Sequence, residues 1–462
     1  MRKRNSVAFF NILSTVILNG LSIFTAPLIS RLLGTSGYGV VSIYTIWVAA
    51  VQIVFALQTQ NTLGNARVEY AEDAQKGYQS SVLSLSVVTF LLLSVPVLLL
   101  REQLAVLLKL PVGMIPLLLL HAFGGSCILF LNSKFTYELK ADRNFFLSLA
   151  LALITLGTSV ALILWMPEGQ EYWGRILSMS LTYGLIGIGG CVYVLAGGRH
   201  FYDRKYWKFC LTLSLPMIFY NLSDLVLGQS DRLMLQRMLS DAAVGQYSLA
   251  YNFGGIMFTI FGAVNNAWFP FFFDDMKQGR KEEIRIHALN YLELFTVLSV
   301  GFILLHREVY HVFAGREFWE GTALIPIFVT GYYLNFLCTF PVNFEYYNKK
   351  TKAVAVITIC CSLVNIGLNY VLIRLIGTAG AAMATAIAHG LQLMLHYLYC
   401  THVLGKGSYP FPVGMWVKYA AVYFAVLAFV MLVPGLGLAR WALGAAIGAW
   451  EVWRIWKRKV LL

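Results

Sequence analysis

Apolar runs long enough to cross a lipid bilayer recur from one end of the chain to the other, and they constrain the fold more than any other feature. A helix of about 20 apolar residues spans the roughly 30 Å of hydrocarbon in a bilayer. The composition agrees, because 58% of the residues are hydrophobic, 12% are charged and the mean hydropathy is +0.69. Soluble domains do not have this composition. We therefore expect an all-α polytopic membrane protein in which the first apolar run, after the basic start Met1–Arg4, remains as a span.

The pattern predicts about 14 transmembrane helices. Most connections are short, so consecutive helices should be antiparallel. The expected spans are residues 7–30, 39–58, 80–100, 112–131, 146–166, 176–197, 209–233, 245–269, 287–305, 322–345, 354–373, 380–400, 415–433 and 437–453.

The Lys and Arg residues indicate how these helices are oriented. With the N-terminus in the cytoplasm, 25 of the 35 Lys and Arg residues fall in or beside the cytoplasmic tails and loops. Such an excess in alternate short loops is the positive-inside pattern of membrane proteins. We expect both termini to be cytoplasmic. We attribute the net charge of +13 to membrane orientation and expect no nucleic-acid partner.

An internal repeat with a period of 206 residues relates the two halves of the chain. At this offset Arg31 falls on Arg237, and Arg143 in one basic loop falls on Lys349 in another. The expected span boundaries agree over six helices. An even number of spans gives both halves the same orientation, as in the parallel repeats of transporters. We expect two six-helix lobes and two extra helices, divided as an N-lobe at 1–197, a cytoplasmic linker at 198–208, a C-lobe at 209–400, and two further spans with a basic tail at 401–462.

The sequence contains no pattern typical of a metal site, a disulfide framework or a catalytic centre. None of the seven cysteines belongs to a CxxC motif or a Cys/His cluster. His121, His389 and His396 are far apart along the chain, and there is no GxSxG, HExxH or P-loop sequence. We expect neither an enzyme nor a protein that carries a metal or a cofactor.

Polar residues mark one face of the seventh expected span, where Asn221, Asp224, Gly228 and Asp231 recur with the helical period. Asp224 lies roughly 21 Å of helix rise from the inner edge of this span, well inside the hydrocarbon. Lipid does not solvate a carboxylate, so Asp224 should face a cavity or a partner. Two interpretations stay open: Asp224 and Asp231 couple a proton or a cation to transport, or they are structural carboxylates paired between packed helices.

Three arginines, Arg31, Arg232 and Arg237, lie at the outer ends of the first and seventh expected spans. Arginines at such positions commonly extend to the membrane surface. Alternatively, arginines that converge from the two lobes would form a positive chamber for phosphate, which a guanidinium binds through two hydrogen bonds. Both interpretations stay open. A fourth arginine, Arg67, lies nearer the inner side of the membrane.

Two segments, which contain Arg31 and Arg237, resemble a known family. The segments S-R-L-L-G-T-S-G-Y-G, from Ser30, and R-M-L-S-D-A-A-V-G-Q-Y, from Arg237, are similar to the polysaccharide-transporter branch of the multidrug/oligosaccharidyl-lipid/polysaccharide exporter superfamily. The basic start, Asn266 with Pro270, and the loop sequences A-D-R-N and Y-N-K-K add to the likeness. It covers about residues 1–400 and indicates no particular sugar.

The resemblance implies a flippase of O-antigen, capsule or exopolysaccharide assembly in the bacterial cytoplasmic (inner) membrane. Two lobes around a cationic cavity would move an undecaprenyl-pyrophosphate-linked glycan to the periplasmic leaflet by alternating access. The implied partners are this glycan, membrane lipid, a proton or sodium counter-ion and a glycan polymerase, and the last two spans would hold the lipid tail. The candidate substrate-binding residues are Arg31, Arg67, Arg232, Arg237 and Asn221, and the candidate coupling residues are Asp224 and Asp231.

Two alternatives stay open. A cation-coupled multidrug antiporter of the same superfamily is favoured by Asp224. Against it, the N-lobe spans contain no acidic residue, and two extra helices favour a lipid substrate. A membrane glycan polymerase or ligase would carry a large outer loop with catalytic residues, whereas the longest expected outer loop is about His306–Gly321.

Overall fold

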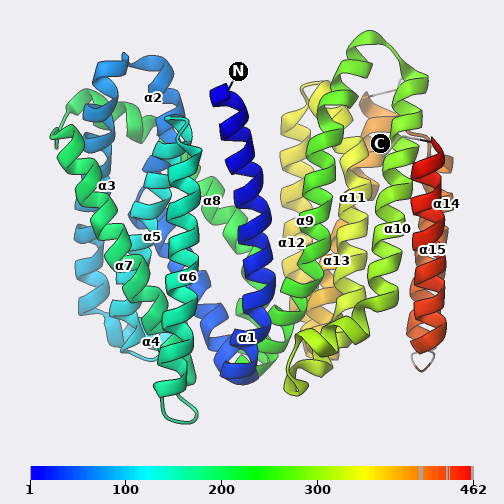
Figure 1. The fold of residues 1–462 in the computed structure, drawn as a ribbon, viewed down its shortest axis with the longest axis horizontal. Helices are drawn as coiled ribbons and strands as arrows, with labels where there is room; N and C mark the ends of the chain where they lie inside the picture. Colours follow the sequence, from blue (N-terminus) through cyan, green and yellow to red (C-terminus); the bar gives the residue numbers. More distant parts are fainter. Residues whose placement is uncertain (1, 405–408, 433–434, 436, 459–462) are drawn as a thin grey trace. The chain divides into compact units, whose positions relative to one another are not determined.

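The computed structural model describes residues 2–404, 409–432, 435 and 437–458 (Figure 1). Side chains are described from Thr25 onward, apart from a few positions inside helices. The long helices run alongside one another within each half of the chain. The helices are α1 (Arg2–Phe55), η1 (Thr59–Thr62), α2 (Leu63–Glu69), η2 (Glu72–Ala74), α3 (Gln75–Leu99), α4 (Arg101–Leu108), α5 (Met114–Tyr137), α6 (Ala141–Trp165), α7 (Glu171–Gly198), α8 (Arg204–Met238), α9 (Asp241–Gln278), α10 (Lys281–Phe313), η3 (Arg316–Leu324), α11 (Ile325–Tyr347), α12 (Thr351–Ile376), α13 (Thr378–Leu398), η4 (Tyr399–Leu404), α14 (Val413–Leu432) and α15 (Gly437–Arg458).

The expected spans correspond to long helices. In the part of the chain that the structure describes, 11 helical segments are long and apolar enough to cross a membrane. Each expected span falls within a long helix to within a few residues, and the first two share α1. The predicted fold class, an all-α polytopic membrane protein, is confirmed.

Breaks in the helices agree with the 206-residue repeat. Inside α1, Gly34 has a φ of 66° and a ψ of 175°, which are not helical values. Glycine takes a positive φ without steric strain. The position 206 residues later is Ser240, the extended residue between α8 and α9, whose hydroxyl accepts a hydrogen bond from Ala243 N at 3.2 Å. The serine cap between α8 and α9 therefore lies at the position of the second repeat that is equivalent to the glycine break of α1 in the first.

A second pair of equivalent turns has a different offset. Leu139, after α5, and Lys349, after α11, have positive φ angles of 57° and 58°. The two turns also share one pattern of backbone hydrogen bonds. They lie 210 residues apart, so the predicted equivalence of Arg143 with Lys349 is wrong by about one helical turn. A shift of one turn keeps the same helix face toward the neighbouring helices.

The chain divides into two compact units, Met1–Leu233 and Met234–Leu462. The division falls inside α8. The start of α8 packs on the first unit, where Trp207 Nε1 donates a hydrogen bond to Ser81 O at 2.9 Å. The division into six-helix lobes around a linker at 198–208 stays a prediction.

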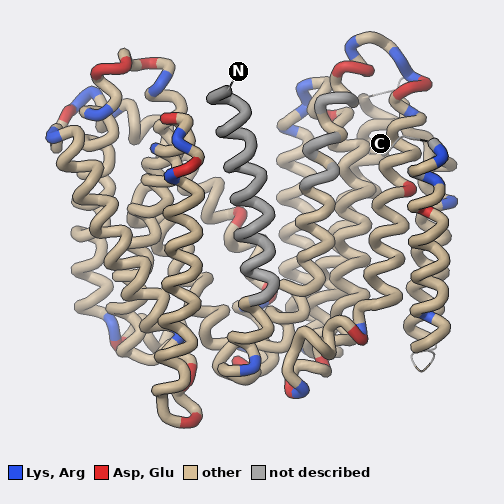
Figure 2. The backbone as a smooth tube through the Cα atoms, viewed as in Figure 1, with Lys and Arg blue, Asp and Glu red and all other residues tan. Residues whose placement is uncertain are grey.

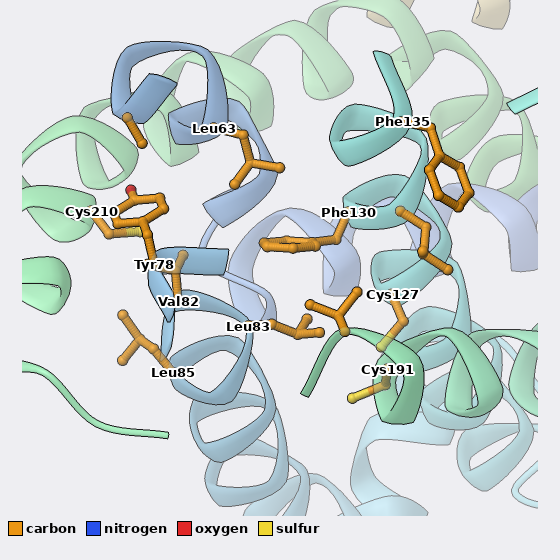
Figure 3. Packing of buried hydrophobic residues seen from close by; sticks show 13 residues of the cluster. Leu63, Tyr78, Val82, Leu83, Leu85, Cys127, Phe130, Phe135, Cys191 and Cys210 are labelled. Atoms are coloured by element: carbon orange, nitrogen blue, oxygen red, sulfur yellow. The ribbon is translucent and has the colours of Figure 1, made fainter. Parts of the chain in front are cut away.

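In the first unit, glycines allow α5 and α7 to pack closely. A Cβ on Gly124 would lie 2.0 Å from Tyr183 O, and a Cβ on Gly187 would lie 2.3 Å from Gly124 O. Small residues permit this close approach between membrane helices. A buried cluster fills the space at one end of these helices, with side chains from α2, α3, α5, α7 and α8 that include Leu63, Tyr78, Val82, Phe130, Cys191 and Cys210 (Figure 3).

The second unit has an aromatic core. The rings of Phe295 on α10 and Phe336 on α11 lie 4.2 Å apart, and Tyr333 on α11 stacks on Tyr423 of α14 at 4.1 Å. Such contacts add to the free energy gained by burial.

Ion pairs hold α15 against α10 in the second unit. Arg454 Nη1 lies 3.2 Å from Glu293 Oε2, and Arg440 pairs with Glu308. α15, which carries these arginines, is not one of the 11 apolar segments.

The remaining charges are distributed as a membrane requires. In each unit the Lys, Arg, Asp and Glu residues gather at the ends of the helices, and the middle of each helix bundle is largely uncharged (Figure 2). Ionised side chains at the bilayer centre are costly, so this distribution follows from a hydrocarbon surrounding.

Candidate functional site

Exposed arginines occur at equivalent places in the two halves. Arg31 lies three residues before the break at Gly34, and Arg237 lies three residues before Ser240. Both side chains are exposed, Arg31 in the first unit and Arg237 in the second. Arg67 is exposed on the last turn of α2.

The predicted carboxylates of α8 have different surroundings. Asp231 is 7% exposed and accepts a hydrogen bond from Arg232 N at 2.8 Å, while the Arg232 side chain donates to Gln229. Asp224 is exposed, and it has no hydrogen bond or ion pair with any side chain that the structure describes. The apolar part of α8 is also the least buried of the candidate spans. Asp224 is thus exposed on α8, and the two interpretations, a coupling residue or a structural carboxylate, stay predictions.

Asn221 is joined to a polar node at the end of α1. The Gln58 side-chain oxygen accepts hydrogen bonds from Gln60 Nε2 at 3.0 Å, Asn61 Nδ2 at 3.1 Å and Asn221 Nδ2 at 3.2 Å. Gln58 and the preceding Leu57 both have a positive φ, 52° and 55°. Residues other than glycine take this conformation only where their surroundings hold them in it. The node therefore fixes the end of α1 and ties it to α8.

A cavity of about 440 Å³ lies inside the first unit, between α1, α5, α6 and α7. Gly125 leaves room for one of its polar groups, because a Cβ there would lie 2.0 Å from Gln52 Nε2. The cavity has a mixed lining, whose polar side chains include Gln52, Asn132, Ser148, Thr155, Arg175 and Tyr183.

Sequence reasoning missed Arg175 and Gln58. The span expected at 176–197 begins one residue after Arg175, whereas α7 begins at Glu171 and carries Arg175 on the wall of the cavity. The polar first turn of α7 hid the start of the helix from a hydropathy pattern. Gln58 carries no signal in the sequence, because its role depends on a backbone conformation that its residue type does not indicate.

Among the described residues, no group of three His, Cys, Asp or Glu side chains is placed to hold a metal ion. The seven cysteines are free thiols. The chemistry that the described arrangement offers is hydrogen bonding and charge attraction, from arginines, amides and hydroxyls.

Comparison with known proteins places the chain in a family. The profile of the family described as "Polysaccharide biosynthesis protein" matches residues 6–276, which is more than half of the chain. A Haemophilus influenzae protein described as "Uncharacterized membrane protein" is 24% identical over 174 residues, which are 37% of this chain and 43% of that protein. The aligned part therefore spans less than half of that relative's length.

Solved structures share the fold. The inward closed conformation of the lipid II flippase MurJ has a TM-score of 0.70 at 14% identity, with 96% of each chain covered. An inward-facing multidrug resistance MATE family transporter of the MOP superfamily has a TM-score of 0.60 at 12% identity, with 89% of this chain and 95% of that chain covered. This multi-pass membrane protein thus belongs to the polysaccharide biosynthesis protein family, and its fold is that of the MurJ and MATE structures.

Proposed function

We propose that the protein is a flippase that moves an undecaprenyl-pyrophosphate-linked oligosaccharide from the cytoplasmic to the periplasmic leaflet of the bacterial inner membrane. It would work by alternating access and serve surface polysaccharide assembly, such as O-antigen or capsule. The family and a fold like that of a lipid II flippase support this proposal. The lipid-linked glycan and membrane lipid are its proposed partners, together with a glycan polymerase that receives the product.

The observation that carries the proposal is the repeated, exposed arginine. Arg31 and Arg237 have the same position relative to the helix breaks of the two repeats. A guanidinium binds phosphate oxygens through two parallel hydrogen bonds. Each of the two arginines is therefore suited to a phosphate group of the substrate. Arg67, Arg232 and Asn221 are the other proposed substrate-binding residues.

The proposal is tested by replacing each arginine in the native host. Arg31→Ala or Arg237→Ala should lower surface glycan about 10-fold or more at normal protein abundance, because each removes a charge-assisted hydrogen-bond pair. Arg143→Ala and Arg285→Ala remove exposed arginines from the first and second unit and serve as matched controls. Full export in Arg31→Lys and Arg237→Lys would reject bidentate phosphate recognition.

Asp224 is the proposed coupling residue, with Asp231 as the second candidate. Asp224 is exposed on α8, and no described side chain neutralises it. Asp224→Asn keeps the shape but not the charge, so it should reach the membrane in normal amount and lose gradient-driven export. The exposed Asp142→Asn is the control. Export at the wild-type rate and gradient dependence would reject coupling, and a joint loss of abundance and export would indicate a structural carboxylate.

A cation-coupled multidrug antiporter is the second candidate, favoured by Asp224 and by the likeness to MATE structures. Efflux of a cationic dye from cells without the glycan pathway separates the two candidates.

The proposed orientation, with both termini cytoplasmic, predicts cytoplasmic signals from reporter fusions after Lys208 and after Arg458. A periplasmic signal after Arg458 would remove one of the last two spans.

A further inference from the structure

Arg175 is a cation on the wall of the cavity in the first unit. Its Nη1 donates to Ser159 Oγ at 2.6 Å, and Ser159 is fully buried. Its Nε is buried and has no hydrogen-bond partner among the described residues. The guanidinium therefore has hydrogen-bonding capacity that this part of the protein does not use.

No described carboxylate neutralises Arg175. Glu171 lies one turn earlier on α7, but its Oε1 accepts a hydrogen bond from Gly169 N at 2.9 Å, and it forms no ion pair with Arg175. Residues 1–24, whose side chains are not described, contain no Asp or Glu. The stretches of α1, α5, α6 and α7 that line the cavity carry no acidic residue away from the helix ends.

An unpaired charge among membrane helices is unfavourable, because desolvation of an ion costs several kcal/mol that only a counter-charge or water offsets. Two neutral groups at the cavity are in a similar state. Asn132 Oδ1 and Thr155 Oγ1 are buried and have no partner among the described residues. An occupant that satisfies all three groups needs a negative charge for Arg175 and hydroxyl groups for Asn132 and Thr155.

We propose that this cavity binds a sugar acid, with its anionic group on Arg175 and its ring hydroxyls against Gln52, Asn132 and Thr155. The volume of about 440 Å³ is far larger than a lone halide requires and lies in the range of small-molecule sites. The anionic group is either the carboxylate of an acidic sugar or free inorganic phosphate, and both present negatively charged oxygens to the guanidinium. This inference is independent of the proposed flippase activity, because the cavity lies within one unit.

The test is titration calorimetry on the purified full-length protein in detergent, with glucuronate, glucose and inorganic phosphate at constant ionic strength. Glucuronate should bind and glucose should not. At a glucuronate concentration 100 times its Kd, the unfolding equilibrium constant should fall about 100-fold. Arg175→Gln should lose this binding, whereas Arg143→Gln, at an exposed arginine of the same unit, should keep it.

A second variant keeps the test decisive if Arg175→Gln does not fold. Ser159→Asp places a carboxylate next to the guanidinium, so the protein should fold with an internal ion pair and no longer bind glucuronate. Phosphate binding without glucuronate binding would overturn the sugar acid as the occupant and identify a site for a free anion. Absence of binding by both anions, or wild-type glucuronate affinity in Arg175→Gln or Ser159→Asp, would overturn the proposal.

Discussion

The two units differ in the surroundings of an arginine inside the helix bundle. In the second unit, the buried Arg454 contacts Glu293 and Glu451, and the fully buried His396 lies 2.8 Å from Glu345. In the first unit, Arg175 borders a cavity and has no acidic partner among the described side chains. A paired charge completes a structure, and removal of one partner leaves the other unsatisfied. An unpaired charge beside a cavity lacks a counter-charge until a ligand enters. An arginine therefore indicates a structural ion pair in the second unit and a binding site in the first.

The largest expected effect is the loss of a paired arginine. Arg454→Met leaves the carboxylates of Glu293 and Glu451 without their counter-charge, which should lower the free energy of unfolding by about 3–5 kcal/mol. Chemical denaturation in detergent measures this change. Arg285→Met, at an exposed position on α10, is the control and should change stability by less than about 0.5 kcal/mol. A change of similar size in both variants would show that the ion pairs of α15 do not stabilise the protein.

A smaller effect is expected at the paired lysine of the first unit. Glu138 Oε1 lies 2.6 Å from Lys134 Nζ, and its Oε2 lies 2.6 Å from Lys140 Nζ. Burial alone would raise the pKa of Glu138, but these two lysines outweigh burial and hold its pKa below the usual range. Glu138→Gln should therefore lower the free energy of unfolding by about 1–2 kcal/mol near neutral pH.

The pH dependence of this effect follows from the sign of the shift. A carboxylate with a lowered pKa in the folded state contributes its full stabilisation above the unfolded-state pKa of about 4.3, and loses it as the pH falls through the folded-state value. The difference in Tm between the wild type and Glu138→Gln should thus be constant from about pH 6 to 8 and shrink below about pH 4. A difference that stays constant down to about pH 3 would show that the two lysines do not stabilise the Glu138 carboxylate.

The smallest change in stability is expected at Arg175. Arg175→Met loses one hydrogen bond to Ser159 but also removes the desolvation cost of an unpaired cation, so the free energy of unfolding without ligand should stay within about 1 kcal/mol. The substitution is the same as in Arg454→Met, so the two variants compare the two environments directly. A loss of more than about 3 kcal/mol at Arg175 would indicate a hidden structural partner and end the contrast between the units.

The sequence predicts the helices of this protein well, because an α-helical span must be long and apolar to cross a bilayer. The helix breaks at Gly34 and Ser240 can also be predicted from the sequence, because glycine and a serine cap are local signals. The ends of the helices are harder to predict from the sequence. α7 begins at Glu171 and α8 at Arg204, several residues before the expected spans. Their first turns are polar, so a hydropathy pattern does not include them.

The contacts of the candidate site depend on packing, which a single sequence does not encode locally. The expected span 176–197 leaves out Arg175, whose position beside the cavity requires four helices to meet. Gln58 gathers three amides only because two successive residues take a left-handed conformation. The arginines near the two helix breaks were identified from the repeat, and their role in substrate binding stays a prediction.

Movement of a lipid-linked glycan across a bilayer is the central claim, and reconstituted vesicles test it most directly. The purified protein is placed in liposomes with a fluorescent polyprenyl-pyrophosphate-linked oligosaccharide, and a membrane-impermeant reagent that destroys the label reports which leaflet holds it. The wild type should give translocation well above that of protein-free vesicles, Arg31→Ala and Arg237→Ala should lower the rate about 10-fold or more, and Arg143→Ala should not change it. Translocation no faster than in protein-free vesicles, with transport of a cationic dye by the same preparation, would contradict the account.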